Sequence, residues 1–205
     1  MASKLDAVIF DLDEVLCDYD FALRLRLLSE LCGLAPALIE QRIWTSGFDE
    51  EADEGRYDLD DYCRLTNEKL EADLSYDALL SARIGAMRRK EDVLAIARAL
   101  AGQVERALLT NNGPFLAQGI DRILPDITEL FGEHIYFSGV LGLAKPDPAA
   151  FLAVAERLGA NPARTLFIDD TPDYLEGARA AGLITHLFES AEALKTVLDD
   201  YGLRV

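Results

Sequence analysis

Short apolar runs recur along the chain, and five of them have the length and composition of buried strands. The predicted strands are Leu5 to Phe10, Ala107 to Thr110, Ile135 to Ser138, Thr165 to Ile168 and Thr185 to Phe188. Two of the stretches between them, 93–101 and 151–159, space their apolar residues as helices do. Strands that alternate with helices predict an α/β fold with a doubly wound parallel sheet.

One long stretch breaks this alternation. Between about Cys17 and about Lys90 no run has the pattern of a strand, and the apolar spacing is helical. The helices predicted there are Phe21 to Cys32, Pro36 to Trp44, Leu59 to Leu70 and Tyr76 to Arg89. The stretch is too long for a crossover connection. We therefore expect an all-helical cap domain, residues 17–90, inserted into a core domain made of residues 1–16 and 91–205.

Three predicted core helices share a start signal. Gly113-Pro114, Asp147-Pro148 and Thr171-Pro172 each place a proline at the first helical position. Two of these helices directly follow a strand, so their N-termini gather at the carboxyl edge of the sheet. Backbone N–H groups and helix dipoles favour an anion at that edge.

The charge balance narrows the range of partners. The chain has 20 Lys and Arg against 37 Asp and Glu, a net charge of −17. This argues against nucleic acid and anionic membranes as partners. The N-terminus lacks the pattern of a signal peptide, and no apolar run approaches the roughly 20 residues of a membrane span. The three cysteines lack CxxC spacing, so we expect reduced thiols and a cytoplasmic protein.

Residues with catalytic chemistry lie at the strand ends or shortly after them. They form four clusters: Asp11-x-Asp13, Thr110-Asn111-Asn112, Lys145-Pro146 and Asp169-Asp170. In a doubly wound sheet all four can converge on one crevice. Together they offer a nucleophilic carboxylate, a second carboxylate, a hydroxyl, a cation and two acids of the metal-binding type. That set is typical of phosphoryl transfer through an aspartyl-phosphate with Mg²⁺.

The four clusters together resemble the haloacid dehalogenase (HAD) superfamily, in the subgroup with a helical cap inserted after the first motif. The matching segments are Asp11-Leu12-Asp13-Glu14-Val15, Leu109-Thr110-Asn111, Ala144-Lys145-Pro146-Asp147-Pro148 and Phe167-Ile168-Asp169-Asp170-Thr171-Pro172-Asp173. The resemblance spans nearly the whole chain with the motifs in order. In the cap, Trp44 to Phe48 and Gly55 to Asp58 resemble the sugar-phosphatase and epoxide-hydrolase N-domain branch.

The resemblance implies a role for each matching residue. Asp11 would attack phosphorus, and Asp13 would protonate the leaving oxygen and later accept a proton from water. The phosphate would be bound by Leu12, Thr110, Asn111 and Lys145. Mg²⁺ would be bound by Asp11, Asp13 through its carbonyl, Asp169 and Asp170. An acid at position 13 favours a phosphatase over a dehalogenase, because halide leaves without needing a proton.

Three further features of the sequence carry specific expectations. Glu14 occupies a position where the family usually has Gly, which puts the turn geometry and the substrate preference in question. Among the basic residues of the cap, Arg56 is the one that we expect to contact the substrate. The acidic run 49–55 lacks the Gly that a calcium-binding EF-hand loop needs at its sixth position, so we expect a solvated loop there.

We therefore predict a Mg²⁺-dependent phosphatase that acts on a small phosphorylated metabolite, with a sugar phosphate as the expected substrate, and that is a monomer or homodimer. A phosphomutase of the same superfamily differs only in the fate of the phospho-aspartate and stays open. A catalytically weak binding or regulatory protein also stays open because of Glu14. A signalling receiver domain has similar site residues, but it is much shorter and lacks the helical insertion.

Overall fold

The computed structural model describes residues 5–205 and confirms the α/β fold. Its sheet has the strand order β5-β4-β1-β6-β7, and every pairing is parallel. The strands are β1 (Ala7–Phe10), β4 (Glu105–Thr110), β5 (Ile135–Phe137), β6 (Thr165–Asp169) and β7 (Ile184–Leu187). All five predicted strands are present, with ends that differ by one or two residues. Residues 1–4 of the expected core segment lie outside the described residues.

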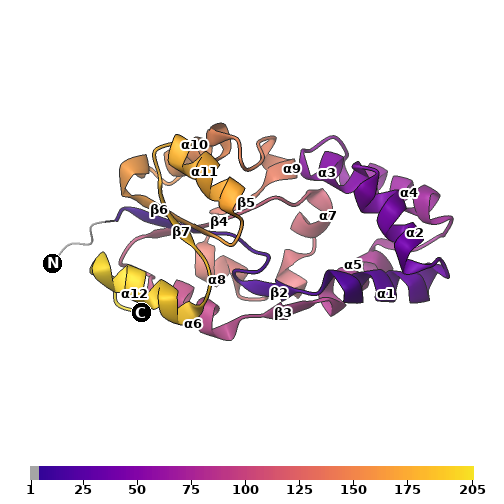
Figure 1. Ribbon diagram of the computed structural model, residues 1–205, viewed down its shortest axis with the longest axis horizontal. Helices are drawn as coiled ribbons and strands as arrows, with labels where there is room; N and C mark the ends of the chain where they lie inside the picture. Colours follow the sequence, from indigo (N-terminus) through magenta and orange to yellow (C-terminus); the bar gives the residue numbers. More distant parts are fainter. Residues whose placement is uncertain (1–4) are drawn as a thin grey trace.

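Helices cover both faces of this sheet, α10 and α11 on one face and α6 and α12 on the other (Figure 1). The core helices are α6 (Glu91–Ala99), α7 (Pro114–Ala117), α8 (Ile127–Phe131), α9 (Ser138–Leu141), α10 (Pro148–Arg157), α11 (Pro172–Ala180) and α12 (Ala191–Asp200), with short 3₁₀ turns at Ile120–Arg122 and Pro162–Arg164. The prolines predicted to open α7, α10 and α11 lie in their first turns. Because β1 is covered on both faces, Val8, Ile9 and Phe10 are all fully buried.

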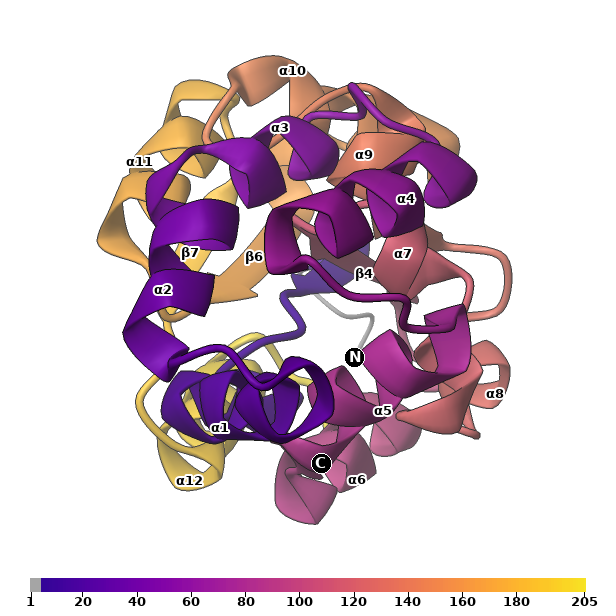
Figure 2. The ribbon, with the colours of Figure 1, turned by 90° about the vertical axis from the view of Figure 1, so that its right-hand side faces the viewer.

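The cap consists of helices that lie in front of the sheet when the molecule is viewed from its cap end (Figure 2). They are α1 (Phe21–Cys32), α2 (Pro36–Glu40), a π-helical turn (Gln41–Thr45), α3 (Phe48–Asp53), α4 (Leu59–Leu70) and α5 (Tyr76–Gly85). The predicted ends of α1 and α4 are confirmed. Each of these two helices is preceded by an aspartate, Asp20 or Asp58, whose side chain accepts a backbone N–H of the first turn.

Three sequence expectations about the secondary structure of the stretch 17–90 are wrong. The helix predicted from Tyr76 to Arg89 ends at Gly85. Two short strands, β2 (Cys17–Tyr19) and β3 (Met87–Arg89), form an antiparallel ribbon where the chain enters and leaves the cap. Three-residue strands are too short to show a period, and their partners are far apart in the sequence. The acidic run, expected as a loop, forms α3, whose Phe48 and Ala52 are buried. The domain boundaries at 16–17 and 90–91 stay a prediction.

Helix α3 rests directly on the core. The carbonyl of Ala52 lies so close to Gly113 and Gly139 that a Cβ at either glycine would approach it within 2.8 and 2.6 Å. The hydroxyl of Ser138 donates a 2.6 Å hydrogen bond to the Asp53 carbonyl. Two glycines and a serine therefore let the α3 backbone sit against the loops at the carboxyl edge of the sheet.

No helix within residues 5–205 combines the length and the apolar character needed to cross a membrane.

Candidate active site

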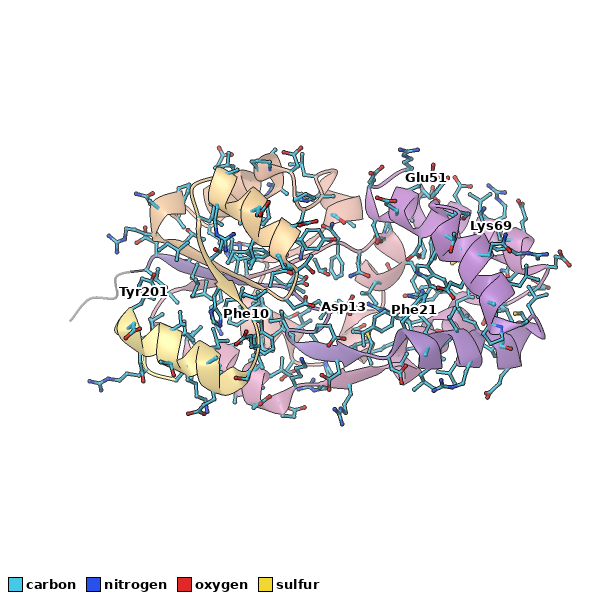
Figure 3. The ribbon with its side chains drawn as sticks, viewed as in Figure 1. Phe10, Asp13, Phe21, Glu51, Lys69 and Tyr201 are labelled. Atoms are coloured by element: carbon cyan, nitrogen blue, oxygen red, sulfur yellow. The ribbon has the colours of Figure 1, made fainter. Side chains whose placement is uncertain are left out.

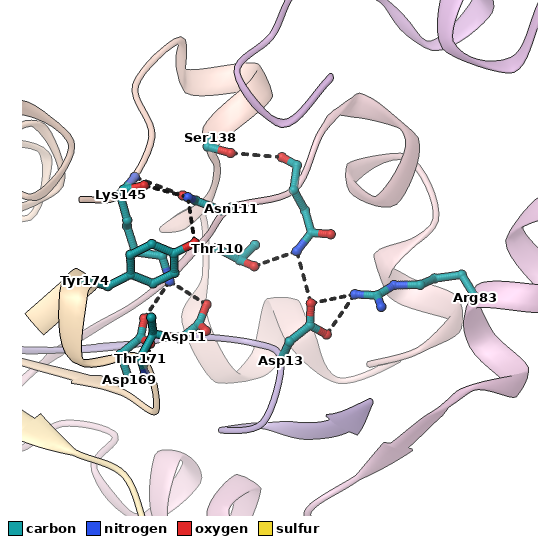
Figure 4. Close-up of polar contacts among 11 residues, drawn as sticks. Asp11, Asp13, Arg83, Thr110, Asn111, Ser138, Lys145, Asp169, Thr171 and Tyr174 are labelled. Atoms are coloured by element: carbon teal, nitrogen blue, oxygen red, sulfur yellow. Dashed lines mark hydrogen bonds and ion pairs between the residues drawn. The ribbon is translucent and has the colours of Figure 1, made fainter. Parts of the chain in front are cut away.

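The site is built around two carboxylates at the ends of adjacent strands. Phe10 of β1 is paired in register with Ile168 of β6, so the next residues, Asp11 after β1 and Asp169 at the end of β6, lie side by side. Both are buried. The ammonium of Lys145 lies between them, 2.8 Å from Asp11 Oδ1 and 2.6 Å from Asp169 Oδ2 (Figure 4). These residues come from three of the four predicted clusters, and Asn111 of the fourth is hydrogen-bonded to Lys145.

Asn111 and Tyr174 hold Lys145 in this position. The Asn111 side-chain amide donates to the Lys145 carbonyl at 2.7 Å, and its oxygen accepts the Lys145 N–H at 2.9 Å. The ammonium also lies 4.7 Å from the ring centroid of Tyr174. Burial disfavours the charge on Lys145, but the Asp11 and Asp169 carboxylates outweigh it and raise the pKa of the lysine. Lys145 is therefore a fixed cation inside the site.

Three carboxylates are spaced to hold a metal ion. Asp11, Asp169 and Asp170 each offer one oxygen, and these oxygens lie within 4.8 Å of one another. Asp169 is further fixed by the backbone N–H of Thr171, which donates to it at 2.8 Å. Hard oxygen donors are the ligands that Mg²⁺ prefers. The donor set fits the expected cofactor, and the Asp13 side chain lies outside it.

Crowding and burial make these acids hard to ionise in the metal-free protein. Burial is the main reason why the pKa of Asp11 is raised to about 7; Lys145 lowers that pKa, and Asp169 raises it. Burial, followed by the nearby Asp169 carboxylate, also raises the pKa of Asp170. A divalent cation would reverse both effects, because it stabilises the ionised carboxylates.

We expect Mg²⁺ binding to strengthen with pH. A metal ligand must be deprotonated, so with the Asp11 pKa near 7 the affinity should rise about tenfold from pH 6 to pH 8, and binding at pH 6 should release a proton. Isothermal titration calorimetry in two buffers of different ionisation enthalpy measures both quantities. The Asp11→Asn variant should lose most of the pH dependence. Equal affinity of the wild type for Mg²⁺ at both pH values would contradict the assignment of Asp11 as a metal ligand.

Asp13 lies apart from the metal cluster, between the sheet and the cap helices (Figure 3). Nη2 of Arg83, from cap helix α5, is 2.8 and 2.6 Å from its two carboxylate oxygens. The Arg83 side chain is buried and its guanidinium stacks on the Tyr19 ring at 3.7 Å. The Asn112 amide donates to Thr110 Oγ1 at 2.7 Å and lies 3.4 Å from Asp13. The two acids of the first motif thus have different partners.

Sequence reasoning missed Arg83 as a site residue. Its position does carry a signal, because Leu79 and Leu80 precede it by four and three residues and are buried on the same face of α5. An arginine on the apolar face of a helix needs a partner, and here that partner is Asp13.

The remaining phosphate-binding candidates are also at the carboxyl edge. Thr110 ends β4 and is almost fully buried, with its hydroxyl bound to Asn112. The Leu12 side chain is fully buried in the core, so only its backbone is available to a ligand. The side chain of Asn111 is engaged with Lys145, which likewise leaves its backbone for phosphate.

Glu14 takes the geometry that a glycine would take with less strain. Its φ is 61°, in the left-handed region. Its carboxylate turns toward β2 and accepts the Tyr19 N–H at 2.9 Å, and its carbonyl accepts Lys90 Nζ. The turn of the first motif is therefore kept with Glu at this position.

Arg56, the cap base proposed from the sequence, lies elsewhere. It is exposed and forms ion pairs with Glu51 and Glu54 of its own segment. The cap base that reaches the site is Arg83.

Known proteins resemble the chain over most of its length. The model of the family described as "Hydrolase: haloacid dehalogenase-like hydrolase" matches residues 5–182. Phosphatase MT3486 of Mycobacterium tuberculosis (strain CDC 1551 / Oshkosh) is 28% identical over 194 residues, which cover 91% of this chain and 88% of that protein.

Two solved structures share the fold. A predicted HAD-like family hydrolase from Porphyromonas gingivalis superposes with a TM-score of 0.82 at 22% identity, covering 97% of this chain and 98% of that one. HAD family enzyme bt-2542 from Bacteroides thetaiotaomicron, in complex with magnesium and inorganic phosphate, gives a TM-score of 0.81 at 21% identity, covering 93% and 98%. The match of the family model over residues 5–182 confirms the resemblance carried by the four motifs: the chain is an enzyme of the haloacid dehalogenase-like hydrolase family.

Proposed function

We propose that the chain is a Mg²⁺-dependent phosphatase that hydrolyses a small phosphate monoester through an aspartyl-phosphate formed on Asp11. The main support is the different setting of the two acids of the first motif. Asp11 lies beside Lys145 and within the metal-type cluster, as a nucleophile should. Asp13 lies apart from that cluster and next to the cap, where the leaving group would be.

In this reaction Asp11 attacks phosphorus and the ester oxygen leaves. Lys145 and the Thr110 hydroxyl bind the phosphate oxygens, with backbone N–H groups at Leu12 and Asn111. These donors are in place before the substrate binds. Hydrogen-bond donors that are already in place stabilise the charge that develops on the phosphate in the transition state most effectively. Mg²⁺, bound by Asp11, Asp169 and Asp170 with the Asp13 carbonyl, would neutralise charge on the phosphate and on the nucleophile.

Asp13 moves the protons. It donates one to the leaving oxygen and then takes one from the water that hydrolyses the aspartyl-phosphate. Arg83 and Asn112 orient its carboxylate. Because Arg83 belongs to the cap, the orientation of Asp13 depends on the cap lying against the core.

Two relatives support this function by what their names state. The relative from Mycobacterium tuberculosis is named a phosphatase. The bt-2542 enzyme was crystallised with magnesium and inorganic phosphate. A small phosphorylated metabolite is the substrate class that we propose here, with a sugar phosphate as the expectation from the cap sequence.

A screen of phosphorylated metabolites tests the proposal. We expect release of inorganic phosphate in the presence of Mg²⁺ and a drop of about 100-fold or more when EDTA replaces it. A requirement for a bisphosphate activator would indicate a phosphomutase instead. Phosphate release that is unchanged by EDTA, or no release from any member of the panel with Mg²⁺, would contradict the proposal.

A further inference from the structure

Cap helix α3 lines two openings: a cleft beside Asn111 and Lys145 of the phosphate site, and an inner cavity beside Arg83 and Asn112. The cleft has a volume of about 410 Å³, and core residues Asn111, Lys145 and Tyr174 form one side of it. The inner cavity has a volume of about 20 Å³ and lies between Arg24 and Arg83 of the cap and the core segment 112–116. Asp49 and Asp53 line both openings. These two acids are one helical turn apart, so they share a face of α3.

The cap side of the cleft carries excess negative charge. Asp49, Glu50, Asp53 and Glu54 all contribute to its wall. Lys145 is matched by Asp11 and Asp169, and Arg83 by Asp13, while Arg24 lines the inner cavity near Asp49 and Asp53 without forming an ion pair with either. Among the ion pairs of residues 5–205, none involves Asp49 or Asp53. Two carboxylates that form no ion pair therefore line both openings.

The surroundings of Asp53 make this lack of a cation costly. Burial, followed by the nearby Asp49 carboxylate, raises the pKa of Asp53 well above its usual range. Arg83 and Arg24 oppose this shift from a distance, and a Gly113 N–H donates to the carboxylate. A ligand cation between Asp49 and Asp53 would relieve their repulsion.

Arg24 provides a second, independent sign of a ligand. It is 8% exposed and lines the inner cavity. Its Nη1 donates to the Tyr19 hydroxyl at 3.0 Å and its guanidinium lies over the Trp44 ring, but its buried Nε finds no acceptor among the described residues. An unpaired buried donor costs about 1–3 kcal/mol. An oxygen of a bound molecule in the inner cavity would satisfy it.

We propose that the leaving group of the substrate is a short amino alcohol, with a protonated amine bound by Asp49 and Asp53 and an oxygen acceptor for Arg24. This inference rests on the proposed function, since it names the alcohol half of the phosphate monoester. Amino sugar phosphates and phosphorylated hydroxy amino acids share this chemistry. A neutral polyol could form hydrogen bonds here but would leave the charge of the two acids unmatched, and a purely anionic leaving group would be repelled by them.

Substrate pairs that differ only by an amine in place of a hydroxyl test the inference. One pair is glucosamine 6-phosphate and glucose 6-phosphate, and the other is O-phosphoserine and 3-phosphoglycerate. With wild-type enzyme and Mg²⁺ we expect kcat/KM to be about 10- to 100-fold higher for the amine in at least one pair, the range for hydrogen bonds to charged groups. The pair that responds distinguishes a sugar from an amino acid.

Variants that keep the side-chain shape of Asp49 and Asp53 but remove their negative charge test whether these two residues cause the preference for the amine substrate. Asp49→Asn and Asp53→Asn should reduce the preference for the amine to a few-fold at most, mainly through KM for the amine substrate. Asn keeps an acceptor for the Tyr62 hydroxyl that now donates to Asp49. Asp60→Asn makes the same charge change on the exposed side of α4 and should leave the preference unchanged. Arg24→Gln should raise KM for both members of a pair.

The outcomes separate the two proposals. If the wild type hydrolyses the hydroxyl member of both pairs as well as the amine member, the inference is wrong and the proposed function stands. The inference is also wrong, and the proposed function also stands, if the wild type cleaves p-nitrophenyl phosphate but none of the four substrates. If it cleaves none of these compounds with Mg²⁺ present, the proposed function fails and the inference fails with it. The wild-type comparison decides the matter even if a variant does not fold.

Discussion

Replacing Asp11 with Asn is expected to abolish turnover, with a loss of at least about 10⁴-fold in kcat. The amide has nearly the shape of the carboxylate but is no nucleophile toward phosphorus. It is also a weaker metal ligand, in a site where Asp11 supplies one of three closely spaced oxygens. The substitution therefore removes the group on which the proposed intermediate forms, and it does so without opening a hole in the core.

The measurement is release of phosphate from p-nitrophenyl phosphate over a range of Mg²⁺ concentrations. If Asp11 served only as a metal ligand, excess Mg²⁺ would restore turnover by the Asp11→Asn variant. If Asp11 is the nucleophile, excess Mg²⁺ should not restore it. Acid-quenched wild-type enzyme should carry covalent phosphate after mixing with substrate, and Asp11→Asn should carry none. Circular dichroism checks that the variant is folded. Undiminished turnover by Asp11→Asn, in protein free of contaminating phosphatase, would refute the aspartyl-phosphate mechanism.

The proximity of Asp11 and Asp169 follows from the sequence because each comes directly after a run of buried apolar residues. Parallel strands bring their carboxyl ends to the same edge of a sheet, so the residues after Phe10 and Ile168 are neighbours once β1 and β6 pair. Lys145 could be assigned to the same edge from the order of the motifs. Its two ion pairs depend on how Asn111 anchors its backbone, which the sequence does not reveal.

The residues that the cap brings to the active site could not be predicted in the same way. Arg24 and Arg83 lie on buried faces of α1 and α5, and the periodicity identifies those faces without stating what they cover. Helix α3 was missed because three consecutive acidic residues separate Phe48 from Ala52, and such an acidic run is typical of a solvated loop. Its contact with Gly113 and Gly139 is a backbone approach between distant segments, which leaves no periodic pattern in the sequence.

Replacing Lys145 with Met is expected to damage both activity and stability. The ammonium is the cation that touches Asp11 and Asp169, and methionine keeps an unbranched chain of similar length without the charge. Loss of a donor fixed against the reacting phosphate should lower kcat/KM by about 10²- to 10³-fold at saturating Mg²⁺. In EDTA, two buried carboxylates lose their counter-ion, and the free energy of unfolding should fall by about 3–5 kcal/mol.

Urea unfolding of wild type and Lys145→Met at two pH values, with EDTA and with Mg²⁺, separates these effects. Lys145 lowers the pKa of Asp11, so its removal raises that pKa further and the folded variant holds a proton that the unfolded chain gives up near pH 4. The stability deficit of the variant should therefore be smaller at pH 5 than at pH 8, and Mg²⁺ should reduce it at pH 8. Lys195→Met, the same change on α12, should shift stability by less than about 0.5 kcal/mol. A deficit independent of both pH and Mg²⁺ would mean that Lys145 acts through packing, not as the counter-ion of Asp11 and Asp169.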